Sequence, residues 1–308
     1  MTYGTAKPAE LAELVTEQRL PGTDDLDRLS TVDLVALMSE QDALVPAAVA
    51  AAGPHIARAV DAIVERMHEG GRLIYIGAGS AGRIGILDAS ECGPTFGATH
   101  DEVLALIAGG AAAVSAAVEG AEDSTDSAVA DLSRVGASSA DAVVGISASG
   151  RTPYAVEAIR YARSVGSLTI GLACTVGSPL ARASDLAIEV VVGPEFVAGS
   201  TRLKAGTAQK LVCNMISTLT MIRLGRTYGN LMVSMTATNA KLWSRAHRLV
   251  SIITGRGDDE VGRALLAAQG SVPTAVIMLL AGVAYEDARF LLQQASNNLR
   301  TAMASIPR

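Results

Sequence analysis

Between residues 72 and 193, short apolar runs alternate with stretches of helical periodicity. The runs RLIYIG (72–77), VLALIAGG (103–110), DAVVGIS (141–147), SLTIGLA (167–173) and LAIEVVVG (186–193) are almost continuously apolar, with little alternation between apolar and polar residues. We expect them to be strands, and AAAVSAAVEG (111–120) is among the helical stretches between them. Strands of this kind are buried on both faces, as in a parallel sheet that is covered by helices. The sequence therefore predicts an α/β fold with a doubly wound parallel sheet within residues 55–225.

The chain outside this sheet is predicted to be helical. Residues 1–29 are polar and are expected to form a loose arm, after which Ser30 or Thr31 caps the first helix. We expect four regions, namely an N-terminal arm with helices at 1–54, the sheet domain at 55–225, a long helix at 226–255 and a small C-terminal helical subdomain at 256–308.

The composition narrows the possible function classes. The net charge of -6 argues against binding to nucleic acid or to an anionic membrane surface. Cys92, Cys174 and Cys213 form no C-x-x-C pair, so we expect no disulfide, no zinc site and a reducing, cytoplasmic location. The N-terminus lacks the layout of a signal peptide, and apolar runs such as SVPTAVIMLLAGVA fall short of the ~18 to 20 residues that cross a bilayer. A soluble protein is expected.

A glycine-rich stretch follows the first predicted strand. Gly77-Ala78-Gly79-Ser80-Ala81-Gly82 matches the dinucleotide pattern G-x-G-x-x-G. In a nucleotide-binding unit an acidic residue ends the second strand, but here Asp101 and Glu102 precede it, and residues 90–100 are predicted to form a loop. We therefore expect no nucleotide cofactor. The backbone N–H groups of such a loop, at the start of a helix, still suit an anion.

A second loop of the same kind follows the strand at 141–147. It reads Ser147-Ala148-Ser149-Gly150-Arg151-Thr152-Pro153, and proline is favoured in the first turn of a helix. Ser149 or Thr152 either caps that helix or binds a ligand. Two hydroxyl-rich loops at the carboxyl ends of strands in one sheet favour a phosphate held without a metal. The candidate phosphate-binding residues are Gly79, Ser80, Ser147, Ser149, Gly150, Arg151 and Thr152.

These loops resemble the SIS (sugar isomerase) fold, whose members bind phosphosugars. Longer segments are similar to the family of N-acetylmuramic acid 6-phosphate etherases, and the resemblance runs from about residue 25 to 255 and more loosely to the end of the sequence. The segments that carry it are YIGAGSAGRIGILDASECGPTFG (75–97), AVEGAEDS (117–124), VVGISASGRTPY (143–154), STRLKAGTAQKLVCNM (200–215) and GNLMVSMTATNAKL (229–242).

The resemblance implies a reaction that uses neither a metal nor a nucleotide. The D-lactyl ether of N-acetylmuramic acid 6-phosphate is cleaved by β-elimination across C2–C3, and water then adds to an unsaturated aldehyde, giving N-acetylglucosamine 6-phosphate and D-lactate. One acidic residue abstracts the C2 proton and protonates the departing lactate, and a second assists the water. Motif matching assigns these roles to Glu91 and Glu122, residue types that suit acid–base work. Asp88 and Glu119 are the neighbouring alternatives, and both glutamates could instead be ordinary solvated acids.

Helix geometry adds an expectation about assembly. If a helix runs unbroken from Gly82, Glu91 lies about 13 Å further along its axis, which is too far for a hexose 6-phosphate bound at the first loop. Either the phosphate sits mainly in the second loop, or Glu91 reaches a site that another subunit completes. We predict a homodimer with shared active sites.

The chain departs from the common family pattern at the first loop. Many members read Gly-Thr-Ser-Gly-Arg where this chain has Gly79-Ser80-Ala81-Gly82-Arg83, so Ala81 lacks one hydroxyl. Its loss removes a hydrogen bond worth on the order of 1 kcal/mol, which weakens substrate binding without changing the reaction. Lys204 and Lys210 either face an anion or are solvated helix residues, and we favour the second interpretation.

Two other functions are compatible with a phosphosugar fold. A transcriptional sensor would need a basic helix-turn-helix, which the acidic N-terminal segment 1–55 does not provide. A binding protein related to the glucokinase regulator would not need both Glu91 and Glu122. An aldose–ketose isomerase would share the C2 proton abstraction but would release no D-lactate.

Overall fold

The computed structural model describes residues 14–235 and 239–306, which form two compact units. The first unit contains the described residues up to Ala89 together with Glu102–Ser217. The second contains Ser90–Asp101 and the described residues from Thr218 onward. The division into two compact units does not show which ranges fold independently. The four regions therefore stay a prediction.

The first unit is built on a five-stranded parallel sheet with strand order β2-β1-β3-β4-β5, which confirms the predicted doubly wound architecture. The strands are β1 (Leu73–Gly77), β2 (Val103–Ile107), β3 (Ala142–Ser147), β4 (Leu168–Ala173) and β5 (Leu186–Glu189). In the register, Ile76 pairs with Leu106 of β2 on one side and with Gly145 of β3 on the other. The strand order therefore reverses between β1 and β3, and ligands of open α/β sheets bind at such a point.

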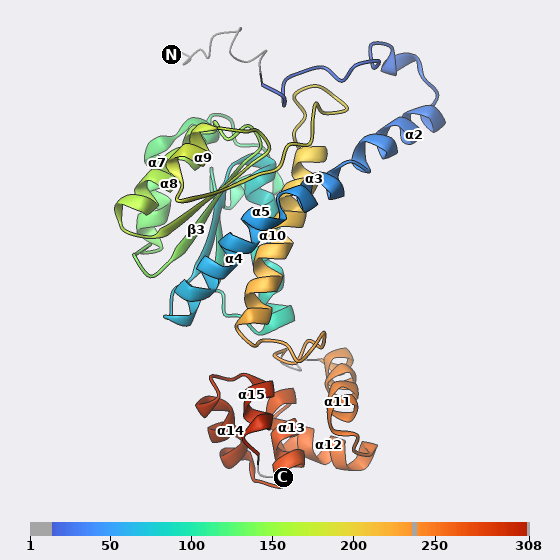
Figure 1. Cartoon of the computed structure of the whole chain (residues 1–308), viewed down its shortest axis with the longest axis vertical. Coiled ribbons are helices and arrows are strands. Elements are labelled where there is room, and N and C mark those ends of the chain that lie inside the picture. Colours follow the sequence, from blue (N-terminus) through green and yellow to red (C-terminus); the bar gives the residue numbers. More distant parts are fainter. Residues whose placement is uncertain (1–13, 236–238, 307–308) are drawn as a thin grey trace. The chain divides into compact units, whose positions relative to one another are not determined.

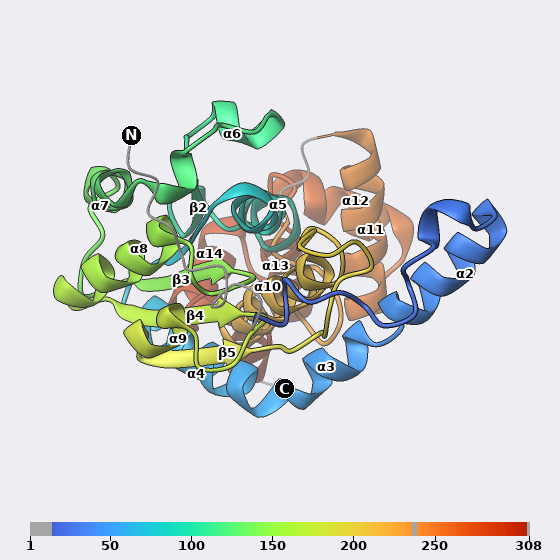
Figure 2. The ribbon, with the colours of Figure 1, turned by 90° about the horizontal axis from the view of Figure 1, so that it is seen from above.

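Helices cover both faces of this sheet. In Figures 1 and 2, α7, α8 and α9 lie on one face, and α4, α5 and α10 lie on the other. Their bounds are α4 (Gly53–His68), α5 (Gly79–Phe96), α7 (Thr125–Arg134), α8 (Pro153–Ser164), α9 (Pro179–Ala183) and α10 (Lys204–Arg223). Between the sheet and α8, the side chains of Ile74, Val143, Tyr154 and Ile159 pack in one buried cluster. Burial on both faces explains why the strands are apolar throughout.

The N-terminal segment forms short helices before α4. They are η1 (Leu26–Arg28), α2 (Thr31–Asp42) and α3 (Val45–Ala51). The predicted cap is confirmed, because the Ser30 hydroxyl accepts the Asp33 N–H at 3.3 Å. The predicted loose arm is wrong at Thr16, which is buried and whose carbonyl accepts the Gly199 N–H at 3.2 Å. Residues 1–13 of that arm lie outside the described residues.

Three predicted elements differ in length. Residues 90–100 were expected to form a loop, but α5 continues through Pro94 to Phe96. The helical pattern at 111–120 yields only α6 (Ala112–Ser115), because Ala116 is already extended, and a 3₁₀ turn, η2 (Ala121–Asp123), follows. The strand predicted to reach residue 193 ends at Glu189 in β5.

The second unit has a helical core of its own. Its helices are the ends of α5 and α10, then α11 (Ala240–Thr254), α12 (Asp258–Ala267), α13 (Val272–Ala281), α14 (Tyr285–Gln294) and α15 (Leu299–Ala304). Val250, Val261, Val276 and Leu299 are among the buried side chains that pack together. The described residues 256–306 thus form four helices, one more than the three short helical patterns that this part of the sequence indicates. The long helix predicted at 226–255 begins at Ala240, and residues 236–238 lie outside the described part.

One helical stretch of the described chain, Thr31–Ala51, is long and apolar enough to cross a bilayer. It covers α2 and α3, and only 11% of its most apolar window is buried. This stretch is not among the apolar runs of the sequence whose length was compared with the thickness of a bilayer.

Candidate active site

The glycine pattern after β1 shapes the start of α5. A Cβ at Gly82 would lie 2.6 Å from Cγ1 of Ile107 and 2.7 Å from the Gly77 carbonyl oxygen. Only glycine therefore allows α5 to begin so close to the strands. The same close packing of a helix against its strand is one of the roles of glycine in the G-x-G-x-x-G pattern, so it accounts for the match.

The loop after β3 is held by its own hydroxyl groups. The Ser147 and Thr152 hydroxyl oxygens lie 2.9 Å apart, and Ser149 Oγ accepts the Arg151 N–H at 3.2 Å. Gly150 has a φ of +61°, and a Cβ there would lie 2.3 Å from Ser178 Oγ. Within the described chain, Thr152 makes no side-chain capping bond to α8. The capping alternative is thus not observed for Thr152, and the hydroxyl is held beside Ser147 instead.

The two loops meet in one cavity of about 270 Å³ at the carboxyl ends of β1 and β3. Its lining residues are Glu17, Ala78, Gly79, Ser80, Ala81, Glu122, Ser147, Ala148, Ser149, Thr152, Gly199, Thr201 and Gln209. Five of the seven predicted phosphate-binding residues and Glu122 therefore lie together. Gly150 and Arg151 do not line the cavity, and Arg151 is exposed. No lysine or arginine is among the described lining residues, so an anion here would be held by N–H and hydroxyl groups and by helix N-termini.

A second cavity of about 230 Å³ adjoins the first, and the two share Ala78, Gly79 and Glu122. Arg83 and Glu119 line only the second cavity. The guanidinium of Arg83 donates to the carbonyl oxygens of Val114 and Ala116 at 3.0 and 2.8 Å, which fixes the segment after β2. Glu122 is thus the acidic residue that both cavities share.

The other predicted catalytic acid lies elsewhere. Glu91 is exposed on α5 and belongs to the second unit. Because α5 is unbroken from Gly79 and rises about 1.5 Å per residue, Glu91 lies about 18 Å along the axis from its start. Its neighbour Asp88 is buried and accepts hydrogen bonds from Tyr75 at 2.9 Å and from Asn214 at 2.7 Å. These bonds give Asp88 a structural role and make it a poor alternative to Glu91.

Glu17 and Gln209 are among the lining residues of the cavity that the sequence did not predict. Glu17 reaches it because the Thr16 carbonyl is bonded to Gly199, and no sequence spacing links positions so far apart in the chain. Gln209 is buried on α10, and its Nε2 has no hydrogen-bond partner among the described residues. Its place within the family segment at 200–215 was the signal that could have pointed to it.

Lys204 contradicts the interpretation as a solvated residue. It is buried, and its Nζ donates to Gln41 Oε1 at 3.0 Å. Burial lowers the pKa of its ammonium, and the negative charges of Glu195 and Asp42 oppose that shift. Glu195 also accepts the backbone N–H of Lys204 at 2.9 Å, so these residues fix the start of α10. Lys210 is exposed, as expected.

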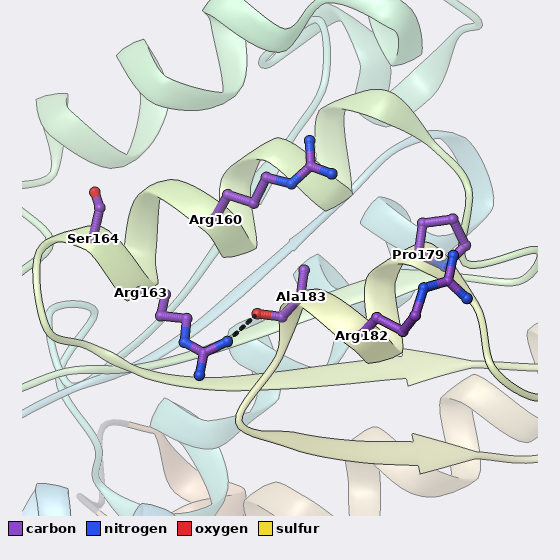
Figure 3. Close-up of a pocket in the computed structure, with 6 residues that line it drawn as sticks. All are labelled: Arg160, Arg163, Ser164, Pro179, Arg182 and Ala183. Carbon is purple, nitrogen blue, oxygen red and sulfur yellow. Dashed lines mark hydrogen bonds between the residues drawn. The ribbon is translucent and has the colours of Figure 1, made fainter.

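Another cavity of the first unit, of about 480 Å³, has a different character. Figure 3 shows three arginines around it, on α8 and α9. Arg160 pairs with Glu157 at 3.3 Å, and Arg163 pairs with Asp185 at 3.2 Å and donates to the Ala183 carbonyl. These charges are largely compensated, and no predicted site residue lines this cavity. Across 14–235 and 239–306, no cluster of three histidine, cysteine or acidic side chains could hold a metal.

Comparison with known proteins relates the chain to one family. The family model of the glucokinase regulatory protein N-terminal SIS domain matches residues 55–163. An N-acetylmuramic acid 6-phosphate etherase of Streptomyces avermitilis is 54% identical over 308 residues, which cover 100% of this chain and 99% of the relative. One from Streptomyces coelicolor is 55% identical over 297 residues, 96% of each chain.

Solved structures are less similar. A phosphoheptose isomerase from Francisella tularensis is 17% identical, with a TM-score of 0.44 over 62% of this chain and 100% of that chain. The curated relatives, at 54% and 55% identity over nearly their full lengths, establish that this chain belongs to the family of N-acetylmuramic acid 6-phosphate etherases.

Proposed function

We propose that the protein cleaves the D-lactyl ether of N-acetylmuramic acid 6-phosphate and releases D-lactate and N-acetylglucosamine 6-phosphate. The observation that carries this proposal is the cavity at the point where the strand order reverses, because it joins both phosphate loops to a carboxylate. The names and full-length similarity of the curated relatives support the same reaction. We place the protein in the cytoplasm, where its substrate would be a phosphosugar.

The phosphate would be bound by the backbone N–H groups and hydroxyls of the two loops. Ser80 supplies a hydroxyl from the first loop, and Ser147, Ser149 and Thr152 supply hydroxyls from the second. The N-termini of α5 and α8 follow these loops, and their dipoles favour a doubly negative group in a cavity without a cationic side chain. Gly150 would act by shaping the loop, and Arg151 by its charge at the exposed rim.

Glu122 and Glu91 would share the acid–base work. Removal of the C2 proton needs a base, the departing lactate needs an acid, and the addition of water needs a second base. Glu122 lines the cavity with the phosphate loops and can contact a bound sugar. Glu91, at the far end of α5, would act in a site that another subunit completes.

A homodimer is therefore part of the proposal. Helix α2 supports it, since none of its residues, all of them described, is buried. Val32 is 78% exposed and Val35 is 60% exposed, and a second subunit would cover such apolar side chains. Sedimentation analysis tests this directly, and a fully active monomer would contradict it.

The decisive experiment is an assay of the purified protein with N-acetylmuramic acid 6-phosphate that follows D-lactate. We expect D-lactate from the wild type and none above background from Glu91→Gln. If the wild type binds the substrate but releases no D-lactate, a sensor function replaces the enzyme. If an isomerised phosphosugar appears without D-lactate, the protein is an isomerase.

A further inference from the structure

The carboxamide of Gln209 is the unusual group of the candidate site. Only three buried side-chain atoms in the described chain have no hydrogen-bond partner, namely Thr16 Oγ1, Gln209 Nε2 and Thr220 Oγ1. Among these three residues, Gln209 alone lines the cavity between the phosphate loops. An unpartnered buried amide lowers the stability of the protein, so its presence calls for a group that binds it in the loaded protein.

The chemistry of a carboxamide limits what that group can be. The phosphate has its own donors in the two loops and the helix N-termini, and a neutral amide adds no charge to them. Nε2 carries two N–H donors and Oε1 is a pure acceptor. Since Nε2 is the atom without a partner, the ligand should offer it a strong acceptor.

We propose that Gln209 recognises the acetamido group of the bound amino sugar. The carbonyl oxygen of an acetamido group is a strong neutral acceptor, so it can supply the hydrogen bond that Nε2 lacks. Gln209 is held for this purpose on α10, whose start is fixed by the contacts of Glu195 and Lys204. The inference rests on the proposed function and makes Gln209 a specificity residue of that site.

Titration calorimetry tests the assignment by measuring the affinities of the wild type and of Gln209→Met for two sugar phosphates, one with an acetamido group and one without. The wild type should bind N-acetylglucosamine 6-phosphate at least tenfold more tightly than glucose 6-phosphate, which lacks the acetamido group. Gln209→Met keeps a side chain of similar length and removes the amide. We expect this variant to lose most of the tenfold preference while its affinity for glucose 6-phosphate stays unchanged.

The melting temperature separates a ligand role from a structural one. Because Gln209→Met removes an unsatisfied buried amide, its melting temperature should be equal to or above that of the wild type. Thr220→Val is the matched control, since it removes another unpartnered buried atom from the same helix outside the cavity. It should leave the affinities for both sugars unchanged.

Two outcomes would overturn the assignment. If Gln209→Met lowers the affinity for both sugar phosphates equally, the residue shapes the cavity and does not bind the acetamido group. If it lowers neither affinity, the residue does not contact the ligand. Should the methionine variant fail to fold, Gln209→Asn, which withdraws the amide by one methylene, must lower the preference in the same direction. The assay for D-lactate is independent, so a protein that shows the preference without releasing D-lactate would refute the etherase proposal alone.

Discussion

The two ends of the parallel sheet differ in whether their polar side chains have hydrogen-bond partners. At the amino ends, Arg72 donates to both carboxylate oxygens of Asp141 at 2.9 and 2.8 Å, and to the carbonyl oxygens of Val135 and Gly136 at 3.0 Å. The N–H of Ser138 donates to the same carboxylate at 2.9 Å. At the carboxyl ends, Gln209 Nε2 is left without a described partner.

The difference separates what holds the fold from what binds a ligand. A buried polar network stabilises a fold only when its members are satisfied, and the amino-end network meets that requirement. Groups that must bind a substrate have to remain available until it arrives. Substitutions in the amino-end network should therefore lower the stability and leave the KM unchanged. Substitutions that remove a ligand-binding or catalytic group at the carboxyl ends should change the KM or kcat and leave the stability unchanged.

The largest expected effect is on catalysis, at Glu122. In Glu122→Gln the carboxylate becomes an amide that cannot accept a proton, so kcat should fall by about 10²–10⁴-fold. Because Glu122 is exposed, the melting temperature should not change. Steady-state release of D-lactate and a thermal melt of the same preparation check both statements.

Glu119→Gln is the matched control for Glu122→Gln. Glu119 lies three residues earlier and lines only the adjoining cavity. We expect its kcat to stay within about threefold of the wild type, a range in which general acid–base catalysis is not lost. If Glu119→Gln lowers kcat and Glu122→Gln does not, Glu119 is the catalytic acid–base residue in place of Glu122.

The amino-end network should yield the largest change in stability. Asp141→Asn leaves the partly buried Arg72 guanidinium without its counter-charge, and removal of one member of such a pair costs about 3 kcal/mol. Urea unfolding should show this decrease while the KM of the folded variant stays unchanged. A KM that rises in step with the instability would mean that the two ends of the sheet are coupled.

The same carboxylate gives stability a defined pH dependence. Burial alone would raise the pKa of Asp141, but the bonds from Arg72 and from the Ser138 N–H outweigh burial and hold the pKa below its ordinary value. As the pH falls, Asp141 is therefore protonated at a higher pH in the unfolded chain than in the folded protein. The contribution of Asp141 is complete above its unfolded pKa and is lost as the pH falls through the lower folded value. Urea titrations across this acid range should show a shallower loss of stability in Asp141→Asn than in the wild type.

A smaller effect is expected at Gly150, in the second phosphate loop. Alanine there would meet Ser178 Oγ and would also have to adopt the positive φ of 61°, which alone costs about 1–2 kcal/mol. The loop should shift and raise the KM several-fold. Gly177→Ala is the control, because Gly177 has a φ of 63° but open space around its Cβ position. If both variants raise the KM equally, the contact with Ser178 has no role in shaping the loop.

Sequence reasoning located the sheet and both loops because each has a local signal. The apolar runs predicted every strand, and hydroxyls after two of them predicted five lining residues of the cavity. The N-terminal segment could not be predicted, because Glu17 reaches the cavity through one backbone bond to Gly199. Lys204 was misjudged for a similar reason, since its partner Gln41 lies 163 positions away. Local patterns carry no information about such contacts.

The smallest expected effect tests the departure of the first loop from the family pattern. Ala81 lines the cavity in the first turn of α5, at the position where the sequence departs from the Gly-Thr-Ser-Gly-Arg pattern that the resemblance implies. Ala81→Ser should add one hydrogen bond to the substrate, worth about 1 kcal/mol, and lower the KM about fivefold. Ser80→Ala should raise the KM by a similar factor if the neighbouring hydroxyl also binds the substrate. A KM that responds to Ser80→Ala but not to Ala81→Ser would show that the second position faces no polar group of the substrate, and the missing hydroxyl would then have no consequence for binding.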